Sequence, residues 1–177
     1  MFKAIKPEVS AFLRAFTAFS GTGLSSFFFG FSLSGFISSF FSTLGGGGGI
    51  IQALPLLGDS HFLVVNGDIW CDFDYSTLID LKHNEQAHLI LVNNPVHHLK
   101  GDFALVHNMI KNTGDIMFTY SGIGIYSADF FAQQQPGVVP LAPIIRSKCE
   151  EDLVSGQYYA GSWTDVGTIE RLSLIHI

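Results

Sequence analysis

Two aspartates lie next to apolar segments that are far apart in the sequence, Asp68 in FLVVNGDIW and Asp165 in SWTDVGT. The apolar run before Asp68, bounded by turn residues, is typical of a strand covered on both faces. In open α/β sheets, ligands bind outside the carboxyl ends of such strands. Mg²⁺ takes oxygen ligands there, often one or two carboxylates together with substrate phosphates. The two aspartates could therefore share Mg²⁺, although a polar turn at Asn66-Gly67-Asp68 and a cap or ion pair at Asp165 would explain each residue singly.

The elements that must position these carboxylates are indicated by alternating apolar runs, charges and turn residues. A glycine loop over residues 45–49 precedes a short helix over residues 50–56. Further helices are predicted over residues 74–85, with Asp74 or Ser76 as the cap, over residues 140–153, and from Thr168 onward. Strands are predicted over residues 62–66, 87–95, 101–108 and 118–126, and two short strands or a hairpin over residues 154–168 deliver Asp165 to a loop. Helices and strands mostly alternate, which predicts a layered, Rossmann-like α/β sheet.

Composition excludes several classes of protein. The chain of 177 residues is of single-domain size, and its formal net charge of −6 gives no sign of nucleic-acid binding. Its two cysteines, Cys71 and Cys149, form no disulfide framework, so a reducing cytoplasm is expected. We interpret both as packing or surface residues, because neither has an evident activating partner.

The first 44 residues differ from the rest of the chain. No Asp, Glu, Lys or Arg occurs from Ala15 to Gly58, and ten of the 17 Phe fall between Phe12 and Phe41. Residues 24–44 are long enough to span a bilayer, but a third of them are Ser and no basic residue follows to anchor them. We favour the interpretation that residues 1–44 are an aberrant low-complexity segment translated from a wrong reading frame, in which case residues 11–44 should add no strand to the central sheet beside residues 62–66. The final LSLIHI matches a translated sequencing adapter, so residues 173–177 are interpreted as an artefactual tail.

Five segments together carry a resemblance to a known family. They are GGGIIQALPLLGDSHFLVVNGDIWCDFD, LVNNPVHHLKGDFAL, FTYSGIGIY, PLAPIIR and GSWTDVGTIERL. These segments resemble the sugar-1-phosphate nucleotidyltransferases, and NPVHHLKGDF with SGIGIY resembles the branch that acts on N-acetylmuramate 1-phosphate. The resemblance covers residues 45–172. It implies a cytoplasmic enzyme of cell-wall sugar recycling whose partners are UTP and a sugar 1-phosphate.

The resemblance also implies roles for individual residues. Asp68 and Asp165 match the Mg²⁺ ligands of the family. Gly48, Gly49 and Asn66 match nucleotide-binding positions, the glycines lying against the uracil. Positions of the sugar pocket are matched by Gly101, Ser121, Gly122 and Trp163. His97 and His98 are interpreted as loop residues with no metal role, because adjacent residues in a turn seldom bind one ion together.

One part of the family pattern is absent from the sequence. The family opens with a strand and a glycine-rich loop carrying Arg and then Lys, which cradle the triphosphate; FSGTGLSS has glycines but no nearby Arg or Lys. The α/β sheet is therefore expected to be incomplete at its N-terminus and the chain as printed to be inactive, with no catalytic residue assigned. Two alternatives stay open: a membrane-anchored, catalytically dead nucleotide-sugar binding module, and a hexosyltransferase using Asp72 and Asp74 as a D-x-D metal motif.

Overall fold

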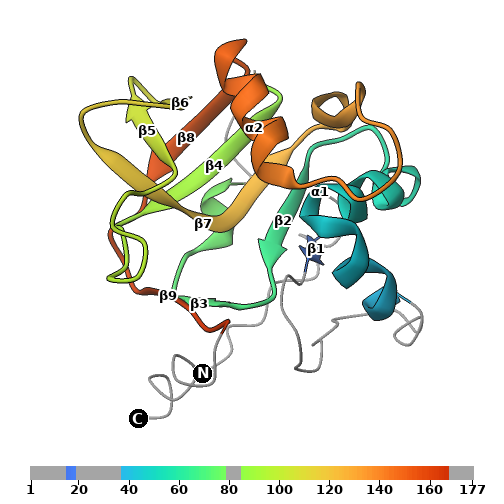
Figure 1. Ribbon diagram of the computed structural model, residues 1–177, viewed down its shortest axis with the longest axis horizontal. Helices are drawn as coiled ribbons and strands as arrows, with labels where there is room; N and C mark the ends of the chain where they lie inside the picture. Colours follow the sequence, from blue (N-terminus) through green and yellow to red (C-terminus); the bar gives the residue numbers. More distant parts are fainter. Residues whose placement is uncertain (1–14, 19–36, 79–84, 168–177) are drawn as a thin grey trace.

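The computed structural model describes residues 15–18, 37–78 and 85–167 (Figure 1). The helix predicted from Thr168, most of the helix predicted over residues 74–85, and residues 24–36 of the possible membrane span lie outside these ranges. A single turn of 3₁₀ helix, η2 (Tyr75–Leu78), is described where the second of these helices was expected to begin. Asp74 caps it, as predicted, since its Oδ1 accepts hydrogen bonds from Ser76 N at 3.0 Å and Ser76 Oγ at 2.7 Å.

A mixed seven-stranded sheet forms the centre of the fold, in the order β1-β2-β7-β4-β8-β6-β5. β1 and β2 are parallel, as are β4 and β8, and the other neighbours are antiparallel. A separate two-stranded sheet pairs β3 with β9. The strands are β1 (Ala15–Ala18), β2 (Phe62–Asn66), β3 (Ile69–Cys71), β4 (Ala87–Val92), β5 (Phe103–Val106), β6 (Met109–Lys111), β7 (Met117–Tyr126), β8 (Val154–Tyr158) and β9 (Trp163–Asp165).

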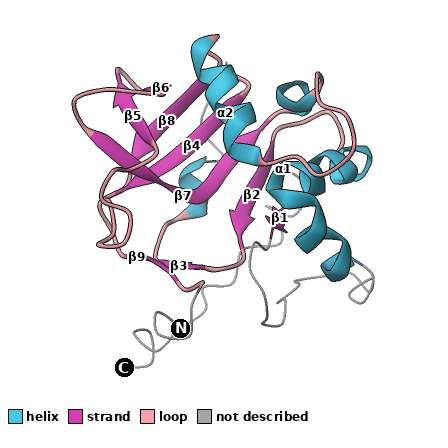
Figure 2. Cartoon of the chain, in the orientation of Figure 1, coloured by secondary structure: helices cyan, strands magenta, loops and turns pink. Residues whose placement is uncertain are grey.

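Alternate residues of the strands feed two apolar layers, one on each face of the sheet. Phe62 and Val64 of β2 pack in a cluster with Ile50 and Ile51 of α1 (Ile37–Leu57) and with Ile144 and Ile145 of α2 (Leu141–Glu150). The intervening residue, Leu63, packs on the opposite face with Phe73, Leu78, Ile90, Ile123 and Ile125. Figure 2 shows α1 and α2 against the strands of the sheet, and both helices contribute to the apolar layer that contains Phe62 and Val64. The predicted layered α/β architecture is therefore confirmed.

The predicted glycine loop is wrong, because residues 45–49 lie inside α1. A Cβ on Gly47 would lie 2.7 Å from Val139 O, and Gly48 N donates to the same carbonyl at 2.9 Å. Glycine costs about 1 kcal/mol relative to alanine in a helix interior. Close packing against the segment before α2 offsets that cost, since tertiary contacts supply most helix stability in proteins.

Residues 11–44 were expected to contribute no strand to the sheet, and this expectation is wrong for Ala15–Ala18. β1 runs parallel to β2 with Ala15 opposite Leu63 and Ala18 opposite Asn66. A segment translated from a wrong reading frame was not expected to pair with β2. The presence of β1 therefore counts against the reading-frame interpretation for these four residues.

The hairpin considered for residues 154–168 does not form. β8 pairs with β4 and β6, whereas β9 pairs with β3 in the second sheet. Among the described residues, no helix combines the length and apolar character needed to cross a membrane.

Candidate active site

Asp68 and Asp165 are brought together by the β3–β9 pairing. Asp68 follows β2 in a two-residue turn, and the next residue, Ile69, lies opposite Asp165 in the antiparallel register. Val166 N donates a hydrogen bond of 2.7 Å to Asp68 O, which closes the ladder at this end. The backbones of two aspartates separated by most of the sequence are thus neighbours in the second sheet, and their sharing of one ion remains a prediction.

Gly122 contacts Asn66 across the β2–β7 pair. Gly122 has a φ of +81°, and a Cβ placed on it would lie 2.8 Å from both Cγ and Nδ2 of Asn66. The left-handed φ coincides with an irregularity of the β4–β7 ladder, where three β7 residues separate Tyr120 from Gly124 but a single residue separates Leu91 from Leu89. β-bulges redirect side chains and are frequent next to active sites. Glycine is therefore required here both by φ and by the close approach of Asn66.

Trp163 and Ser121 are joined by a direct hydrogen bond. The indole N–H donates to the carbonyl oxygen of Ser121 at 2.9 Å, while the buried Ser121 hydroxyl oxygen accepts from Ile123 N at 3.2 Å. This contact ties β9, which ends in Asp165, to the bulge of β7. Six residues predicted for the site are therefore neighbours through strand pairing and direct contacts: the two aspartates, Asn66, Ser121, Gly122 and Trp163.

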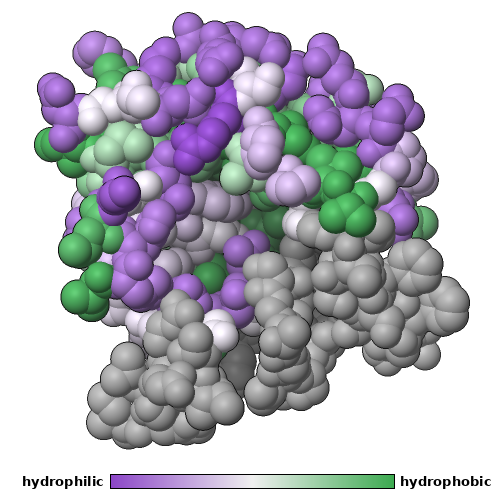
Figure 3. Space-filling view, viewed as in Figure 1, coloured by the Kyte–Doolittle hydropathy of each residue, from purple (hydrophilic) through white to green (hydrophobic). Residues whose placement is uncertain are grey.

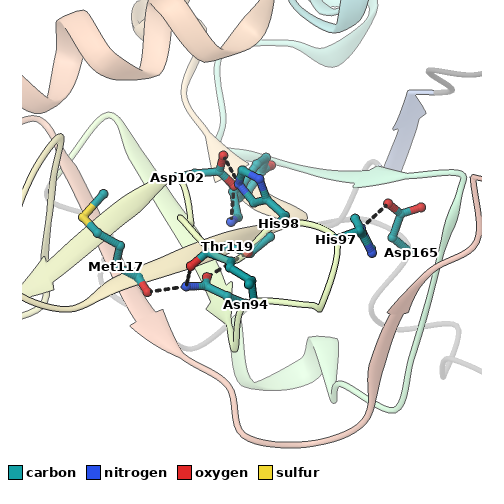
Figure 4. Close-up of polar contacts among 9 residues, drawn as sticks. Asn94, His97, His98, Asp102, Met117, Thr119 and Asp165 are labelled. Carbon is teal, nitrogen blue, oxygen red and sulfur yellow. Dashed lines mark hydrogen bonds and ion pairs between the residues drawn. The ribbon is translucent and has the colours of Figure 1, made fainter.

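The loop between β4 and β5 carries Gly101, the remaining residue predicted for the sugar pocket. Its φ is +65°, and a Cβ would lie 2.8 Å from Asn94 Oδ1 and 2.9 Å from both Phe118 N and Phe118 O. Asn94 fixes the loop, donating from Nδ2 to Leu99 O at 3.1 Å and to Met117 O at 2.9 Å and accepting from Thr119 Oγ1 at 2.9 Å (Figure 4). The positive φ of residue 101 and its close approach to Asn94 and to the backbone of β7 therefore explain why this residue is glycine.

The neighbouring histidines have different partners. His98 Nε2 lies 2.9 Å from Asp102 Oδ1, and Asp102 Oδ2 accepts from Tyr120 N at 2.9 Å, which anchors the loop to β7 a second time. His97 Nε2 lies 3.6 Å from Asp165 Oδ2, as Figure 4 shows. The prediction that these histidines do not share one ion stays untested. His97 nevertheless lies at the candidate metal site, which the sequence interpretation did not foresee.

Asn94 and Asp102 were also missed by the sequence interpretation. Their side chains make three hydrogen bonds to β7 and two within the β4–β5 loop, but no composition or spacing rule singles out an Asn before Pro95 as an anchor. The i, i+4 spacing of His98 and Asp102 was an available signal.

Gly48 and Gly49 are buried residues of α1. The contact described for Gly48 is with Val139, on the α1–α2 side of the fold. A nucleotide-binding role for the two glycines therefore remains a prediction.

Other candidate residues have structural partners. Asp72 Oδ1 accepts hydrogen bonds from Tyr159 and, at 2.9 Å, from Ser162 N, while Asp74 caps η2, so both residues of the D-x-D motif are engaged. The Tyr159 hydrogen bond lowers the pKa of Asp72 below its ordinary value. Burial raises the pKa of the Cys149 thiol to about 11, which suits a packing residue and opposes a nucleophilic role.

The carboxylates of Asp68 and Asp165 offer the oxygen ligands that a hard cation prefers. Oxygens of the substrate would complete its coordination shell. Gly167 N donates to Asp165 Oδ1 at 2.7 Å, which orients the carboxylate. Among the described residues, no group of three or more His, Cys, Asp or Glu could hold a metal without other ligands. Two carboxylates and substrate phosphates are the pattern that Mg²⁺ commonly uses. The face drawn in Figure 3 is hollowed near its middle, and both hydrophilic and hydrophobic residues border the hollow.

Comparison with known proteins bears on this arrangement. No family model matches the chain. The chain is 44% identical over 133 residues to N-acetylmuramate α-1-phosphate uridylyltransferase of Neisseria meningitidis serogroup B, a match covering 71% of this chain and 58% of the relative. The resemblance to the sugar-1-phosphate nucleotidyltransferases is confirmed. The chain spans less than two thirds of the length of this relative.

Solved structures show the same fold. A Bacillus anthracis structure assigned as a glucose-1-phosphate thymidylyltransferase superposes with a TM-score of 0.63 at 17% identity, covering 75% of this chain and 59% of that one. The inositol-1-phosphate CTP transferase from T. maritima gives a TM-score of 0.59 at 14% identity, with 73% and 58% covered. The chain therefore has the nucleotidyltransferase fold.

Proposed function

We propose that the chain represents most of the catalytic domain of a uridylyltransferase. Its reaction joins UTP to N-acetylmuramate 1-phosphate, giving a nucleotide sugar and pyrophosphate, in the recycling of cell-wall sugars in the cytoplasm. The observation that supports the proposal most directly is the β3–β9 pairing, in which Asp165 lies opposite Ile69, the residue after Asp68, while Gly122 contacts Asn66. The meningococcal relative supports the choice of base and sugar, because its name states both.

The residues of the cluster have distinct roles in this proposal. Asp68 and Asp165 would hold Mg²⁺, which neutralises charge on the phosphates when bound. Asn66 would contact the nucleotide, and Gly122, on the sugar side, leaves room for the Asn66 side chain, since a Cβ there would meet the Asn66 amide. The Trp163–Ser121 hydrogen bond fixes the wall of the sugar pocket and, through β9, the position of Asp165.

We further propose that the chain as printed does not turn over. No Arg or Lys occurs between Ala15 and Gly58, so the loop that cradles the triphosphate in the family has no match there. Loss of one preorganised donor to developing negative charge typically costs about 10²–10³-fold in rate. Several such donors are missing.

A chimaera tests both proposals. Residues 1–44 are replaced by the N-terminal segment of the meningococcal relative that precedes its aligned region. Pyrophosphate release is then measured with UTP, N-acetylmuramate 1-phosphate and Mg²⁺. We expect turnover by the chimaera and none by the printed chain. A folded chimaera that stays inactive, or a printed chain that is active, would contradict the respective proposal.

A further inference from the structure

We propose that the loop over residues 93–102 recognises a carboxylate on the sugar, with Lys100 as the recognising cation. The inference rests on the proposed function, since it concerns the sugar subsite of that enzyme. N-acetylmuramate differs from N-acetylglucosamine by a lactyl ether that carries a carboxylate. A cationic side chain near the sugar would distinguish the two sugars by a charge-assisted hydrogen bond to that carboxylate.

The loop is held in place beside the candidate metal site. Asn94 and Asp102 fix it to β7 through hydrogen bonds of 2.9 Å to Met117 O and from Tyr120 N. At its tip, His97 Nε2 lies 3.6 Å from Asp165 Oδ2. Lys100 is three residues further along the same loop. A lysine has a flexible four-carbon stem and a compact charge, so it can reach an anion over a range of positions.

The basic side chains elsewhere on the described part of the domain already have partners. Lys111 pairs with Asp152, and Lys148 lies 3.0 Å from Glu151 Oε2. The guanidinium of Arg146 lies over the ring of Phe103 at 4.9 Å. Lys100 is exposed and pairs with no carboxylate among the residues that the structure describes. It is therefore the lysine or arginine of this set that is available to a ligand.

The experiment compares three ligands on the full printed chain in the presence of Mg²⁺: N-acetylmuramate 1-phosphate, its lactyl methyl ester, and N-acetylglucosamine 1-phosphate. Calorimetry gives the dissociation constants for the chain and for its Lys100→Gln and Lys111→Gln variants. The two variants make the same charge change at a loop position and at a control position. We expect the free carboxylate to strengthen binding about tenfold over the ester, because a hydrogen bond to a charged group is worth at least that factor.

Lys100→Gln should abolish the preference for the free carboxylate without weakening N-acetylglucosamine 1-phosphate, and Lys111→Gln should retain it. A preference that survives in Lys100→Gln, or that both variants lose equally, would overturn the inference. Equal binding of all three ligands would overturn it while leaving a sugar-phosphate site intact. Absence of binding by every sugar phosphate would contradict the proposed function as well.

Discussion

The indole N–H of Trp163 donates to the carbonyl oxygen of Ser121 at 2.9 Å, and this bond connects the two-stranded sheet to the central one. Trp163→Phe keeps the aromatic ring but removes the donor. We expect it to lower the free energy of unfolding by about 1 kcal/mol, the net value of a typical hydrogen bond. Urea denaturation measures the change. Trp70→Phe is the control, since Trp70 lies on the neighbouring strand with 46% of its surface exposed, and an equal loss in that variant would count against a role for the bond.

Gly122→Ala should destabilise the domain more than Gly58→Ala does. Both glycines have a left-handed φ, +81° and +75°, but a Cβ on Gly58 meets nothing within 4 Å, whereas one on Gly122 meets Asn66 at 2.8 Å. Backbone strain alone costs about 1–3 kcal/mol in either variant. Thermal unfolding measures the loss of stability in each variant, and the difference between the Gly122→Ala and Gly58→Ala losses is the steric contribution. Asn66→Ala combined with Gly122→Ala should recover part of that difference, and equal losses in the two single variants would show that the contact is unimportant.

The stability of the domain should depend on pH through the Tyr159–Asp72 hydrogen bond. The bond lowers the pKa of Asp72 below 3.8, so its contribution is present above pH 3.8 and is lost as pH falls through the lowered value. Burial and the bond to Asp72 raise the pKa of Tyr159 from 10.0 to about 12, so the contribution is lost again as pH rises toward 12. Tyr159→Phe should therefore destabilise the domain between about pH 4 and pH 10, with a smaller effect outside that window. Urea midpoints measured across pH test this, and a difference that does not vary with pH would contradict it.

The central strands could be predicted because their apolar runs and turn residues are local signals. β2, β4 and α2 fall within the predicted segments, and β7 begins one residue before its predicted segment. α1 could not be placed correctly, since glycine propensity favours a loop and the packing against Val139 that overrides it comes from a segment about 90 residues later. β1 was missed for a similar reason, because its partner is the open edge of β2 and its own composition gives no strand signal.

Residues of the candidate site that belong to a sequence motif could be predicted. Residues that reach the site only through tertiary contacts were missed. Asp68 and Asp165 follow from the family motifs, and strand pairing then brings them together. Asn94, Asp102 and the position of His97 beside Asp165 depend on how one loop folds back on β7, which local sequence does not encode.

The turnover of the chimaera with the meningococcal N-terminal segment, after Asp68→Asn and after Asp165→Asn, tests the proposed metal site most directly. Asp72→Asn is the matched control, because Asp72 lies near Asp68 in sequence but is hydrogen-bonded to Tyr159 and Ser162. Mg²⁺-dependent pyrophosphate release from UTP and N-acetylmuramate 1-phosphate is measured for all three variants, with circular dichroism to confirm folding. We predict a loss of about 10²–10³-fold for Asp68→Asn and for Asp165→Asn, with activity retained in Asp72→Asn. Near-normal turnover in either of the first two variants would contradict the proposed metal site.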